Sequence, residues 1–288
     1  MKQFFKMMFA STLGFFIAMF LVGAIMFVTM IGMVAGLSKS SAAAVGPKAG
    51  ESVFKITLTG QIPETAVDNP FSVFMTGDEQ DLSMRSLVEA IRNAKEQDAV
   101  KGIYLDMGLF STGVVTLDAV RRALIDFKEG GKFVVAYADR YTQGGYYLAS
   151  VADKVFLNPE GMLSINGLSS QTTFIKGALE KIGVEIMVFR VGTYKGAVEQ
   201  FMNDKLSDAN REQITSYQQG IWGNLTRDIA KSRKINAADV NRFADEGGSL
   251  LDASRAVEFK LVDELKYRRE VEQYLMEKAG QKGDKLKT

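Results

Sequence analysis

A long uncharged segment near the N-terminus is the feature that most restricts how this chain can fold. Residues 7–37 contain no charged side chain, and most of them are apolar. About 20 apolar helical residues cross the hydrocarbon core of a bilayer, so this segment is long enough to span it with some tilt. A buried helix of a globular protein would have a polar face, and this segment has none. We therefore predict a transmembrane anchor over residues 1–37.

A cleaved signal peptide is the alternative to a retained anchor. The run Ala42-Ala43-Ala44 offers the small residues that a cleavage site needs. The apolar core of a signal peptide is only ~7–15 residues long, however, and the uncharged segment is much longer. We therefore favour a retained anchor.

The lysines around this segment say little about its orientation. Lys2 and Lys6 precede it, and Lys39 and Lys48 follow it, so the positive-inside bias is weak. We expect the N-terminus to lie inside, because a single N-terminal anchor commonly leads the following domain across the membrane.

The chain contains neither histidine nor cysteine. This excludes a Ser-His-Asp triad, a cysteine nucleophile, a zinc site with His or Cys ligands and an iron–sulfur cluster. Any general base must be Lys, Asp, Glu or Tyr. There is also no Gly-x-x-x-x-Gly-Lys-Ser/Thr loop for a nucleotide. We accordingly predict no cofactor and no metal.

The charge of the chain is unevenly distributed. Residues 1–50 carry four lysines and no acid, which leaves 31 basic and 34 acidic side chains in the remainder. A nucleic-acid-binding protein should have a clustered basic surface, so this slightly acidic body argues against nucleic acid as a partner.

Composition also suggests the domain boundaries. Residues 38–50 are rich in Ser, Ala and Gly and contain Pro47, which predicts a linker. Residues 51–280 are numerous enough to form one well-buried domain. Residues 281–288 hold three lysines and one Asp, which is typical of a solvated tail or the start of an inter-repeat linker.

Strand-like and helix-like periodicities alternate along this domain, which predicts α/β layers with mostly parallel strand pairing. Strands are predicted over residues 53–58, 102–106, 133–137, 155–157 and 185–190. Helices are predicted over residues 83–96, 117–127, 145–152, 175–182, 207–233, 237–244 and 252–258, with a loop over 63–80.

The longest predicted helix begins after Ser207, a suitable N-cap residue. Its apolar stripe consists of Ile214, Tyr217, Ile221, Leu225 and Ile229. We expect this stripe to pack against the sheet rather than to bind a ligand.

A glycine pair marks the first segment that could support chemistry. Gly144 and Gly145, within residues 141–150, follow a predicted strand and open a helix. Such glycines allow a tight turn and can present N–H groups to a nucleophile or an oxyanion. On spacing alone, we prefer to interpret the segment as a glycine turn with aromatic packing.

Two further segments are candidates. Lys195, within residues 190–196, lies between glycines just past a predicted strand, although most lysines are simply solvated at the surface. Residues 106–113 lie between a strand and a helix and could form an oxyanion hole, but Ser111 and Thr112 there are more often local caps.

The segments Tyr141-x-x-Gly144-Gly145-Tyr146-Tyr147-Leu148-Ala149-Ser150 and Gly192-Thr193-Tyr194-Lys195 together resemble the signal peptide peptidase A, or protease IV, family. The resemblance runs from the anchor to the tail and is most specific in the second segment. Long bacterial members consist of two tandem repeats of one fold, and this chain resembles the first repeat. The resemblance implies a Clp-protease/crotonase-like layered α/β fold preceded by one N-terminal transmembrane helix.

The resemblance also implies a Ser–Lys dyad. Lys195 matches the family's general-base lysine, and Gly144, Gly145, Gly192, Thr193 and Tyr194 form the supporting loops. The position of the serine nucleophile is occupied by Gln143. The family's Pro-Gly-Gly oxyanion turn is also missing. In long members the other repeat supplies the serine, so we expect this chain alone to be inactive.

A physical argument favours this division between repeats. Lysine has a reference pKa of about 10.4, so it carries a proton at neutral pH and cannot accept another. Burial in an apolar interface disfavours the ammonium and can lower the pKa by several units. Lowering the pKa by about 3 units costs about 4 kcal/mol. Only a packed interface between repeats could sustain that cost.

The resemblance to this family also implies a location and partners for the protein. It predicts a single-pass protein of the bacterial inner membrane whose domain lies on the periplasmic, or outer, side. It predicts hydrophobic peptide substrates, namely cleaved signal peptides, and a tetrameric homo-oligomer. An extended peptide could add to a sheet edge.

Two other functions remain open. The chain could be a non-catalytic, membrane-anchored peptide-binding or scaffold module, complete as it stands. It could also be a crotonase-like acyl-CoA enzyme, although the anchor and the Tyr194-Lys195 pair weigh against this.

Overall fold

The computed structural model of the chain describes residues 1–40, 52–65, 83–189, 191–248 and 252–288, with residues 30–40 described by their backbone alone. The described residues belong to two units, the N-terminal helix and the domain that begins at residue 52. Most of the predicted linker and most of the predicted loop over 63–80 lie outside the described residues.

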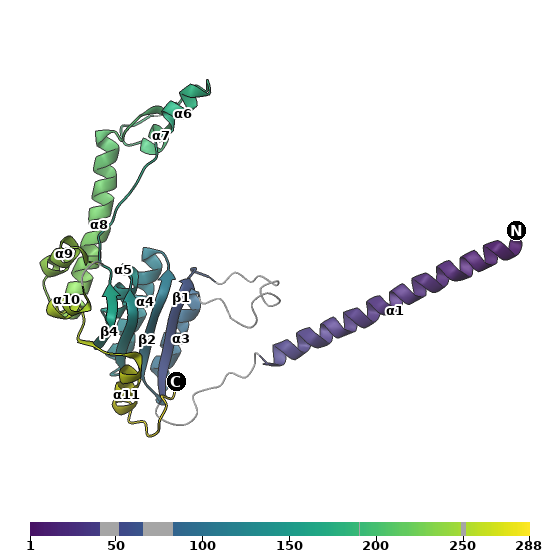
Figure 1. Ribbon diagram of the computed structural model, residues 1–288, viewed down its shortest axis with the longest axis horizontal. Coiled ribbons are helices and arrows are strands. Elements are labelled where there is room, and N and C mark those ends of the chain that lie inside the picture. The colour runs from purple at the N-terminus through teal and green to yellow at the C-terminus, as the bar shows by residue number, and fades with distance from the viewer. Residues whose placement is uncertain (41–51, 66–82, 190, 249–251) are drawn as a thin grey trace. The chain divides into compact units, whose positions relative to one another are not determined.

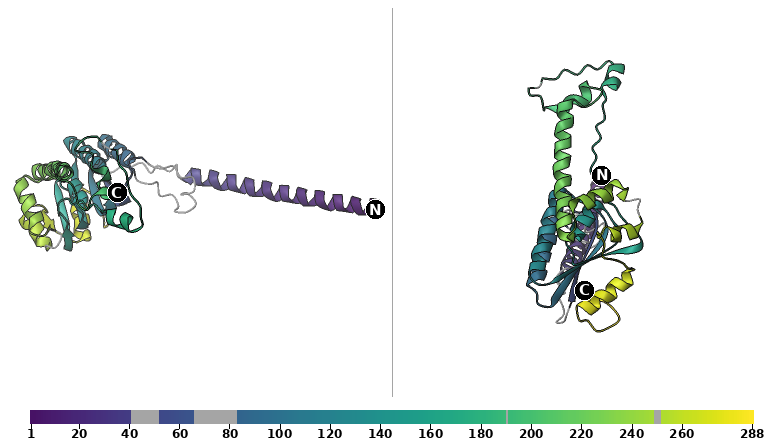
Figure 2. Two further views of the ribbon diagram at one scale, coloured as in Figure 1. Left: turned by 90° about the horizontal axis from the view of Figure 1, so that it is seen from above. Right: turned by 90° about the vertical axis from the view of Figure 1, so that its left-hand side faces the viewer.

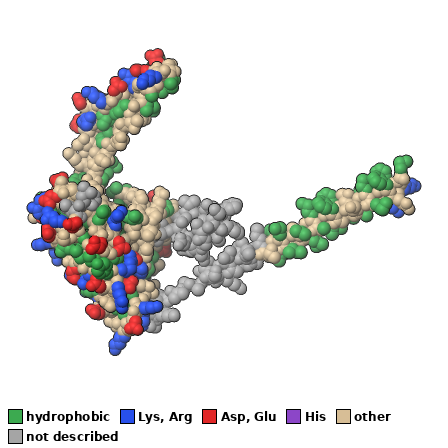
Figure 3. Space-filling model, in the orientation of Figure 1, with side chains coloured by type: hydrophobic (Ala, Val, Ile, Leu, Met, Phe, Trp, Pro, Cys, Tyr) green, Lys and Arg blue, Asp and Glu red, His purple; other side chains and the backbone are tan. Residues whose placement is uncertain are grey.

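The first unit is a single helix, α1 (Lys2–Ser40). Its portion Lys2–Thr29 contains an 18-residue window with a mean hydropathy of 2.3 and is long and apolar enough to cross a membrane, a property that signal sequences share. The hydroxyls of Thr12 and Thr29 donate to the carbonyls of Met8 and Ile25, so both are satisfied within the helix. Figure 3 shows apolar side chains along this helix and lysines at its N-terminal end.

The domain is built on a sheet of five parallel strands that lie in sequence order (Figure 1). The strands are β1 (Ser52–Gln61), β2 (Val100–Ser111), β3 (Phe133–Tyr141), β4 (Lys154–Leu163) and β5 (Glu264–Leu265). The predicted α/β fold with parallel pairing is therefore confirmed, and the first four strands contain the predicted ranges 53–58, 102–106, 133–137 and 155–157. β5 consists of only two residues and was not predicted.

Both faces of the sheet are buried, because successive side chains of a strand point to opposite faces. In β3, Val134 and Ala136 belong to one apolar core while Val135 and Tyr137 belong to another. The first core is covered mainly by α3 (Met84–Glu96), α4 (Val114–Glu129), α5 (Gln143–Ala149), α9 (Ala237–Asp245) and α10 (Ala253–Glu258). The second is covered by α11 (Arg268–Lys278), another element that was not predicted.

Capping explains where several of these helices begin. The Ser83 hydroxyl accepts from the backbone nitrogen of Ser86 at the start of α3, and Ser86 returns the bond in a capping box. The longest helix of the domain, α8 (Asp208–Arg233), begins where predicted, because Ser207 accepts from the backbone nitrogen of Asn210.

The segment between β4 and the middle of α8 forms an exposed arm, which we define as residues 174–189 and 191–220. It carries α6 (Lys176–Lys181), the 3-10 turn η1 (Gly196–Val198) and α7 (Glu199–Met202). Among the described residues of the arm only Glu199 is buried. Figure 2 shows α8 extending beyond the helices that cover the sheet, with α6 and α7 near its N-terminal end.

Two predictions fail in the arm. Residues 184–189 of the predicted strand 185–190 have no regular secondary structure, and Arg190 lies outside the described residues. The side chains of Met187 and Phe189 are 79% and 91% exposed. A strand needs a hydrogen-bonded neighbour, and the described sheet ends without reaching this segment.

The stripe of α8 packs on the core only at its C-terminal end. Ile229 is buried and Leu225 packs partly against the core, as predicted. Ile214 and Ile221 are only half-buried, and Tyr217 is 70% exposed. The prediction was wrong for this first half, because the N-terminal half of α8 belongs to the arm.

The C-terminal residues turn back toward the sheet. The backbone nitrogen of Val53 in β1 donates to the carbonyl of Lys287 over 3.2 Å. The Gln281 side chain also bonds the backbone of Lys287 in both directions. Residues 281–288 are mostly exposed, but these bonds attach their end to β1.

Candidate functional site

Lys195 lies in the arm, immediately before the turn η1. Gly192 has φ +105°, a backbone conformation that side chains other than glycine rarely adopt, and its carbonyl accepts from the Lys195 nitrogen over 3.4 Å. The lysine side chain is exposed in this chain. The predicted motif Gly192-Thr193-Tyr194-Lys195 is therefore a surface turn that presents its lysine outward.

Lys195 is one of the residues that line an open hollow of about 750 Å³. It is lined by residues between 188 and 198 and by Asn210, Gln213, Ile214 and Tyr217 of α8. Ile214 and Tyr217, which we had expected to pack against the sheet, instead form the α8 wall of this hollow.

A buried carboxylate holds the lysine loop against the start of α8. Glu199 is only 2% exposed. It accepts from the Ser207 backbone nitrogen at 3.0 Å, from the Ser207 hydroxyl at 2.5 Å and from the Asn210 amide at 3.2 Å. A Cβ on Gly196 would lie 2.4 Å from the Asn210 side chain, so glycine is required there. We did not predict this cluster from the sequence, where Glu199 and Asn210 are 11 residues apart.

The surface around the hollow is strongly apolar. Phe189 and Val191 are each 91% exposed, Met187 is 79% exposed and Tyr194 is 55% exposed. Large exposed apolar patches are uncommon on monomeric proteins and are typical of interaction sites.

Gln143 lies elsewhere in the domain, at the first residue of α5. Its side-chain oxygen accepts from the backbone nitrogens of Asn166 and Gly167, each at 3.1 Å. The position expected to hold a nucleophile therefore holds an acceptor that binds the segment after β4 to the start of α5.

Close packing explains the glycine pair that follows. A Cβ on Gly144 would lie 3.1 Å from Leu117. On Gly145 it would lie 3.1 Å from the Thr142 hydroxyl, which accepts from the Gly145 nitrogen as the N-cap of α5. That N–H is thus already bonded within the chain.

Residues 106–113 do not form the turn that we expected between a strand and a helix. β2 continues through Ser111, so Asp106 and Gly108 are strand residues. Asp106 is 6% exposed and forms ion pairs with Lys55 at 2.8 Å and Arg268 at 2.6 Å. Most of this candidate segment is therefore strand, and the suggestion that it could form an oxyanion hole stays a prediction.

The structure does not bring the two predicted groups of residues together. Every residue that lines the hollow at Lys195 comes from positions 188–217. The described contacts of Gln143 are with the segment after β4. Lys195 thus has its own surface in the arm, separate from the Gln143 turn.

Comparison with known proteins gives a consistent assignment. Residues 126–282, more than half of the chain, match peptidase family S49. Protease 4 of Salmonella typhi is 36% identical over 211 residues, which cover 70% of this chain and 34% of that protein. Protease 4 of Haemophilus influenzae is 38% identical over 155 residues, which cover 54% of this chain and 25% of that protein.

A plant protein is also similar. The chloroplastic serine protease SPPA of Arabidopsis thaliana is 30% identical over 234 residues, which cover 81% of this chain and 33% of that protein. The chain thus spans about a third or less of the length of these relatives. The match over residues 126–282, which contains the Gln143 turn, the arm and α8, shows that this chain belongs to peptidase family S49.

Proposed function

We propose that this chain is the lysine-bearing part of a membrane-anchored serine endopeptidase whose nucleophilic serine lies in a second S49 repeat. The observation that carries this proposal is the exposed Lys195 in an apolar hollow of the arm, together with Gln143 at the position expected for serine. The relatives, two named Protease 4 and one named a serine protease, are long enough to contain another repeat.

The domain organisation forms part of this proposal. Residues 1–37 would be the anchor, 38–50 a linker, 51–280 a Clp-protease/crotonase-like domain and 281–288 a tail or the start of an inter-repeat linker. The parallel sheet and the apolar α1 support this arrangement.

A second repeat would have to cover the arm before Lys195 could act as a base. The exposed side chains of Phe189 and Val191 provide the apolar surface that such a partner would bury. Burial by the same partner would remove water from the lysine amine and favour its neutral form. Assembly as a homo-oligomer, which the family resemblance suggests is tetrameric, would provide this cover.

The chemistry would then proceed in two stages. Neutral Lys195 would take the proton of the serine hydroxyl while the serine oxygen attacks the peptide carbonyl carbon. Backbone N–H groups of the second repeat would stabilise the oxyanion. The lysine would pass its proton to the leaving amine. It would then take a proton from a water molecule whose oxygen attacks the acyl carbon, and it would return that proton to the serine oxygen as the ester bond breaks.

The substrates would be hydrophobic peptides, namely cleaved signal peptides released from the bilayer. An anchor at α1, with the N-terminus inside and the domain on the outer side of a bacterial inner membrane, would hold the site close to such peptides. Each substrate would bind as an added strand whose alternate side chains enter pockets.

The test uses the gene beyond residue 288 and its full product. We expect a second repeat with a Ser-Gly-Gly segment, and peptidase activity that Lys195→Ala lowers at least about 10³-fold, as expected for loss of a catalytic base. Lys205→Ala, at another exposed lysine of the arm, is the matched control and should retain full activity. Full activity of Lys195→Ala would contradict the proposal, as would activity on polar peptides but not apolar ones.

A non-catalytic peptide-binding or scaffold module is the second candidate. The hydrogen-bonded Gln143 favours it, because this position carries no nucleophile. A stop codon at the end of this chain, together with binding of apolar peptides without cleavage, would establish this second function instead.

A further inference from the structure

A buried arginine connects α8 with two other helices of the domain. Arg121 of α4 is only 3% exposed. Its guanidinium donates to the Tyr147 carbonyl and, over 2.8 Å, to the Ser150 hydroxyl at the end of α5. It also donates to the Asp228 carbonyl at 2.8 Å and to the Ser232 hydroxyl at 2.7 Å in α8.

The surroundings of Arg121 explain how this cation is tolerated inside the domain. None of its described hydrogen bonds is to a carboxylate; the acceptors are carbonyls and hydroxyls near the C-terminal ends of α5 and α8. Helix C-termini carry partial negative charge and stabilise a nearby cation. The Tyr147 ring lies 4.4 Å from the guanidinium carbon and adds a cation–π contact.

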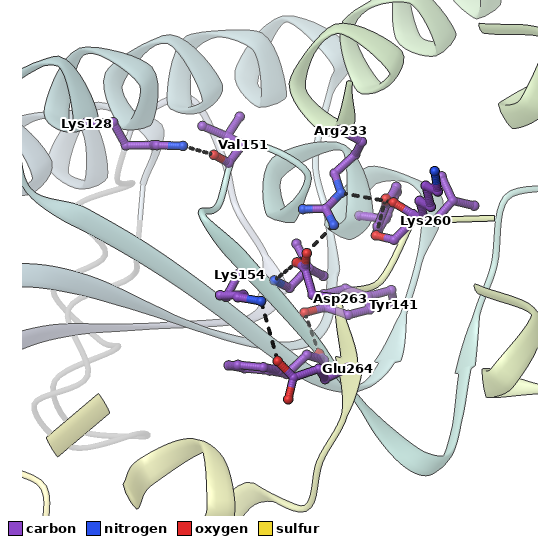
Figure 4. A network of polar contacts seen from close by, with 12 residues as sticks. Lys128, Tyr141, Val151, Lys154, Arg233, Lys260, Asp263 and Glu264 are labelled. Carbon is purple, nitrogen blue, oxygen red and sulfur yellow. Dashed lines mark hydrogen bonds and ion pairs between the residues drawn. The ribbon is translucent and has the colours of Figure 1, made fainter. Parts of the chain in front are cut away.

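A second arginine also holds the end of the same helix (Figure 4). Arg233, the last residue of α8, has a side chain that is 7% exposed and pairs with Asp263 at 2.9 Å. Asp263 in turn accepts from the backbone nitrogen of Val155 in β4 at 2.7 Å. The end of α8 is therefore connected to α4 and α5 through Arg121 and to the sheet through Arg233.

These contacts at the C-terminal end of α8 fix the direction of the rest of this long helix. Asn210, which bonds the loop of Lys195 through Glu199, lies 18 residues before Asp228 in the same helix. At 1.5 Å per residue this is roughly 27 Å, so a tilt of α8 by about 5° at Asp228 would move Asn210 by about 2 Å. A catalytic group misplaced by ~1 Å can lose about 10²-fold in rate.

We propose that Arg121 and Arg233 are positioning residues that set the direction of the arm and therefore the position of Lys195. The catalytic part of this inference rests on the proposed function; the structural part does not. The four contacts of Arg121 cross from α4 to both α5 and α8, so they hold the helices in one relative arrangement. The arm beyond them has only one buried residue, Glu199, to hold it by packing.

The first experiment measures the direction of the arm. The chain has no cysteine, so once any cysteine outside residues 1–288 is replaced by serine, spin labels can be placed at Asn93→Cys in α3 and Thr215→Cys in α8 of the full-length protein, diluted with unlabelled protein. We expect Arg121→Met to broaden the label-to-label distance distribution at least twofold. Arg122→Met is the matched control, since its side chain is 77% exposed and pairs only with Asp118 among the described residues.

The second experiment measures catalysis on the same variants. We expect Arg121→Met to lower kcat about 10- to 100-fold while KM stays within about threefold, since the substrate site itself is untouched. Arg122→Met should match the wild type. If Arg121→Met does not fold, Ser232→Ala is the second variant; it removes one acceptor, keeps the cation bonded and should broaden the distribution to a smaller extent.

The outcomes separate this inference from the proposed function. An unchanged distance distribution in folded Arg121→Met, or in Ser232→Ala where Arg121→Met does not fold, overturns the inference even if Lys195→Ala is inactive. A broadened distribution supports the structural part even if Lys195→Ala stays active, a result that would remove only the proposed function. Broadening together with an unchanged kcat overturns the catalytic part.

Discussion

The side-chain oxygen Oε1 of Gln143 lies 3.1 Å from the backbone nitrogen of Gly167 and accepts its hydrogen bond. The same oxygen accepts from Asn166, so one amide satisfies two consecutive backbone donors. Gly167 has φ +85°, a conformation suited to glycine. The residue at the expected nucleophile position therefore has a structural role in this chain.

Replacing this amide tests that role. We expect Gln143→Met to lower the free energy of unfolding by about 1–2 kcal/mol, because two backbone donors lose their acceptor. Gln143→Glu keeps an acceptor oxygen and should lose less. Chemical denaturation followed by circular dichroism measures both. Equal stability of Gln143→Met and the wild type would contradict this account.

Gln143→Ser tests whether the chain holds both parts of a dyad. The lining of the Lys195 hollow does not include the Gln143 turn, so we expect no peptidase activity from this variant of the isolated chain. A fluorogenic apolar peptide provides the assay. Activity in Gln143→Ser that Lys195→Ala then removes would show that the two positions meet within one chain.

The buried carboxylate of Glu199 should control the local stability of the arm. Glu199→Ala leaves the donors of Ser207 and Asn210 without their shared acceptor, which should lower the local stability of the arm by about 1–3 kcal/mol. Hydrogen exchange of the backbone amides over residues 192–212 should become about 5- to 100-fold faster, while exchange in β3 stays unchanged. Glu212→Ala is the control, since Glu212 bonds the exposed Tyr194 hydroxyl over 3.4 Å. Unchanged exchange in Glu199→Ala would refute the assignment.

The hydroxyl of Tyr104 is buried beneath α11 and has no hydrogen-bond partner among the described residues. Since an unsatisfied buried polar group is unfavourable, Tyr104→Phe should raise the free energy of unfolding by about 1 kcal/mol. Thermal denaturation measures the change. A loss of stability would mean that the hydroxyl has a partner in solution.

The stability of the domain should fall steeply at alkaline pH. Burial raises the pKa of Tyr147 to about 12, above the usual value of about 10. Between these values the unfolded chain loses the phenolic proton while the folded chain keeps it, so stability is present below pH 10 and is lost as pH rises toward 12. Burial raises the pKa of Tyr137 in the same way, also to about 12.

Tyr147→Phe isolates one of these contributions. It should reduce the slope of unfolding free energy against pH between 10 and 12 by up to about 1.36 kcal/mol per pH unit. At neutral pH Tyr147→Phe should lower the free energy of unfolding by about 1 kcal/mol, because the hydroxyl donates to Asp228 over 3.1 Å. An unchanged slope would show that this phenol titrates normally in the folded state.

The sequence predicted the elements whose signal is local. The strand segments 53–58, 102–106, 133–137 and 155–157 were correctly predicted, and Ser207 correctly marked the start of α8. Periodicity cannot show whether an extended segment finds a neighbour, so 185–190 was wrongly predicted as a strand. For the same reason the stripe from Ile214 to Ile229 did not reveal that its first half belongs to the arm.

The candidate site was predictable only in part. Lys195 was singled out as a candidate site residue between glycines, and in the structure it lines an open hollow. The Glu199–Asn210 contact depends on how the chain turns back on itself, which no single-sequence pattern contains. The buried Arg121 was missed because an arginine in a helix pattern is usually solvent-exposed.

The most direct test of the central claim is the accessibility of the Lys195 amine in the full-length, assembled protein. Hydroxyl-radical footprinting followed by mass spectrometry measures it without depending on the protonation state of the amine, with the exposed Lys205 as the internal reference. The account predicts that both lysines react at similar rates in this chain alone and that Lys195 reacts at least tenfold more slowly than Lys205 after assembly. Equal reaction of the two lysines in the assembled, active protein would contradict the claim that a partner covers Lys195.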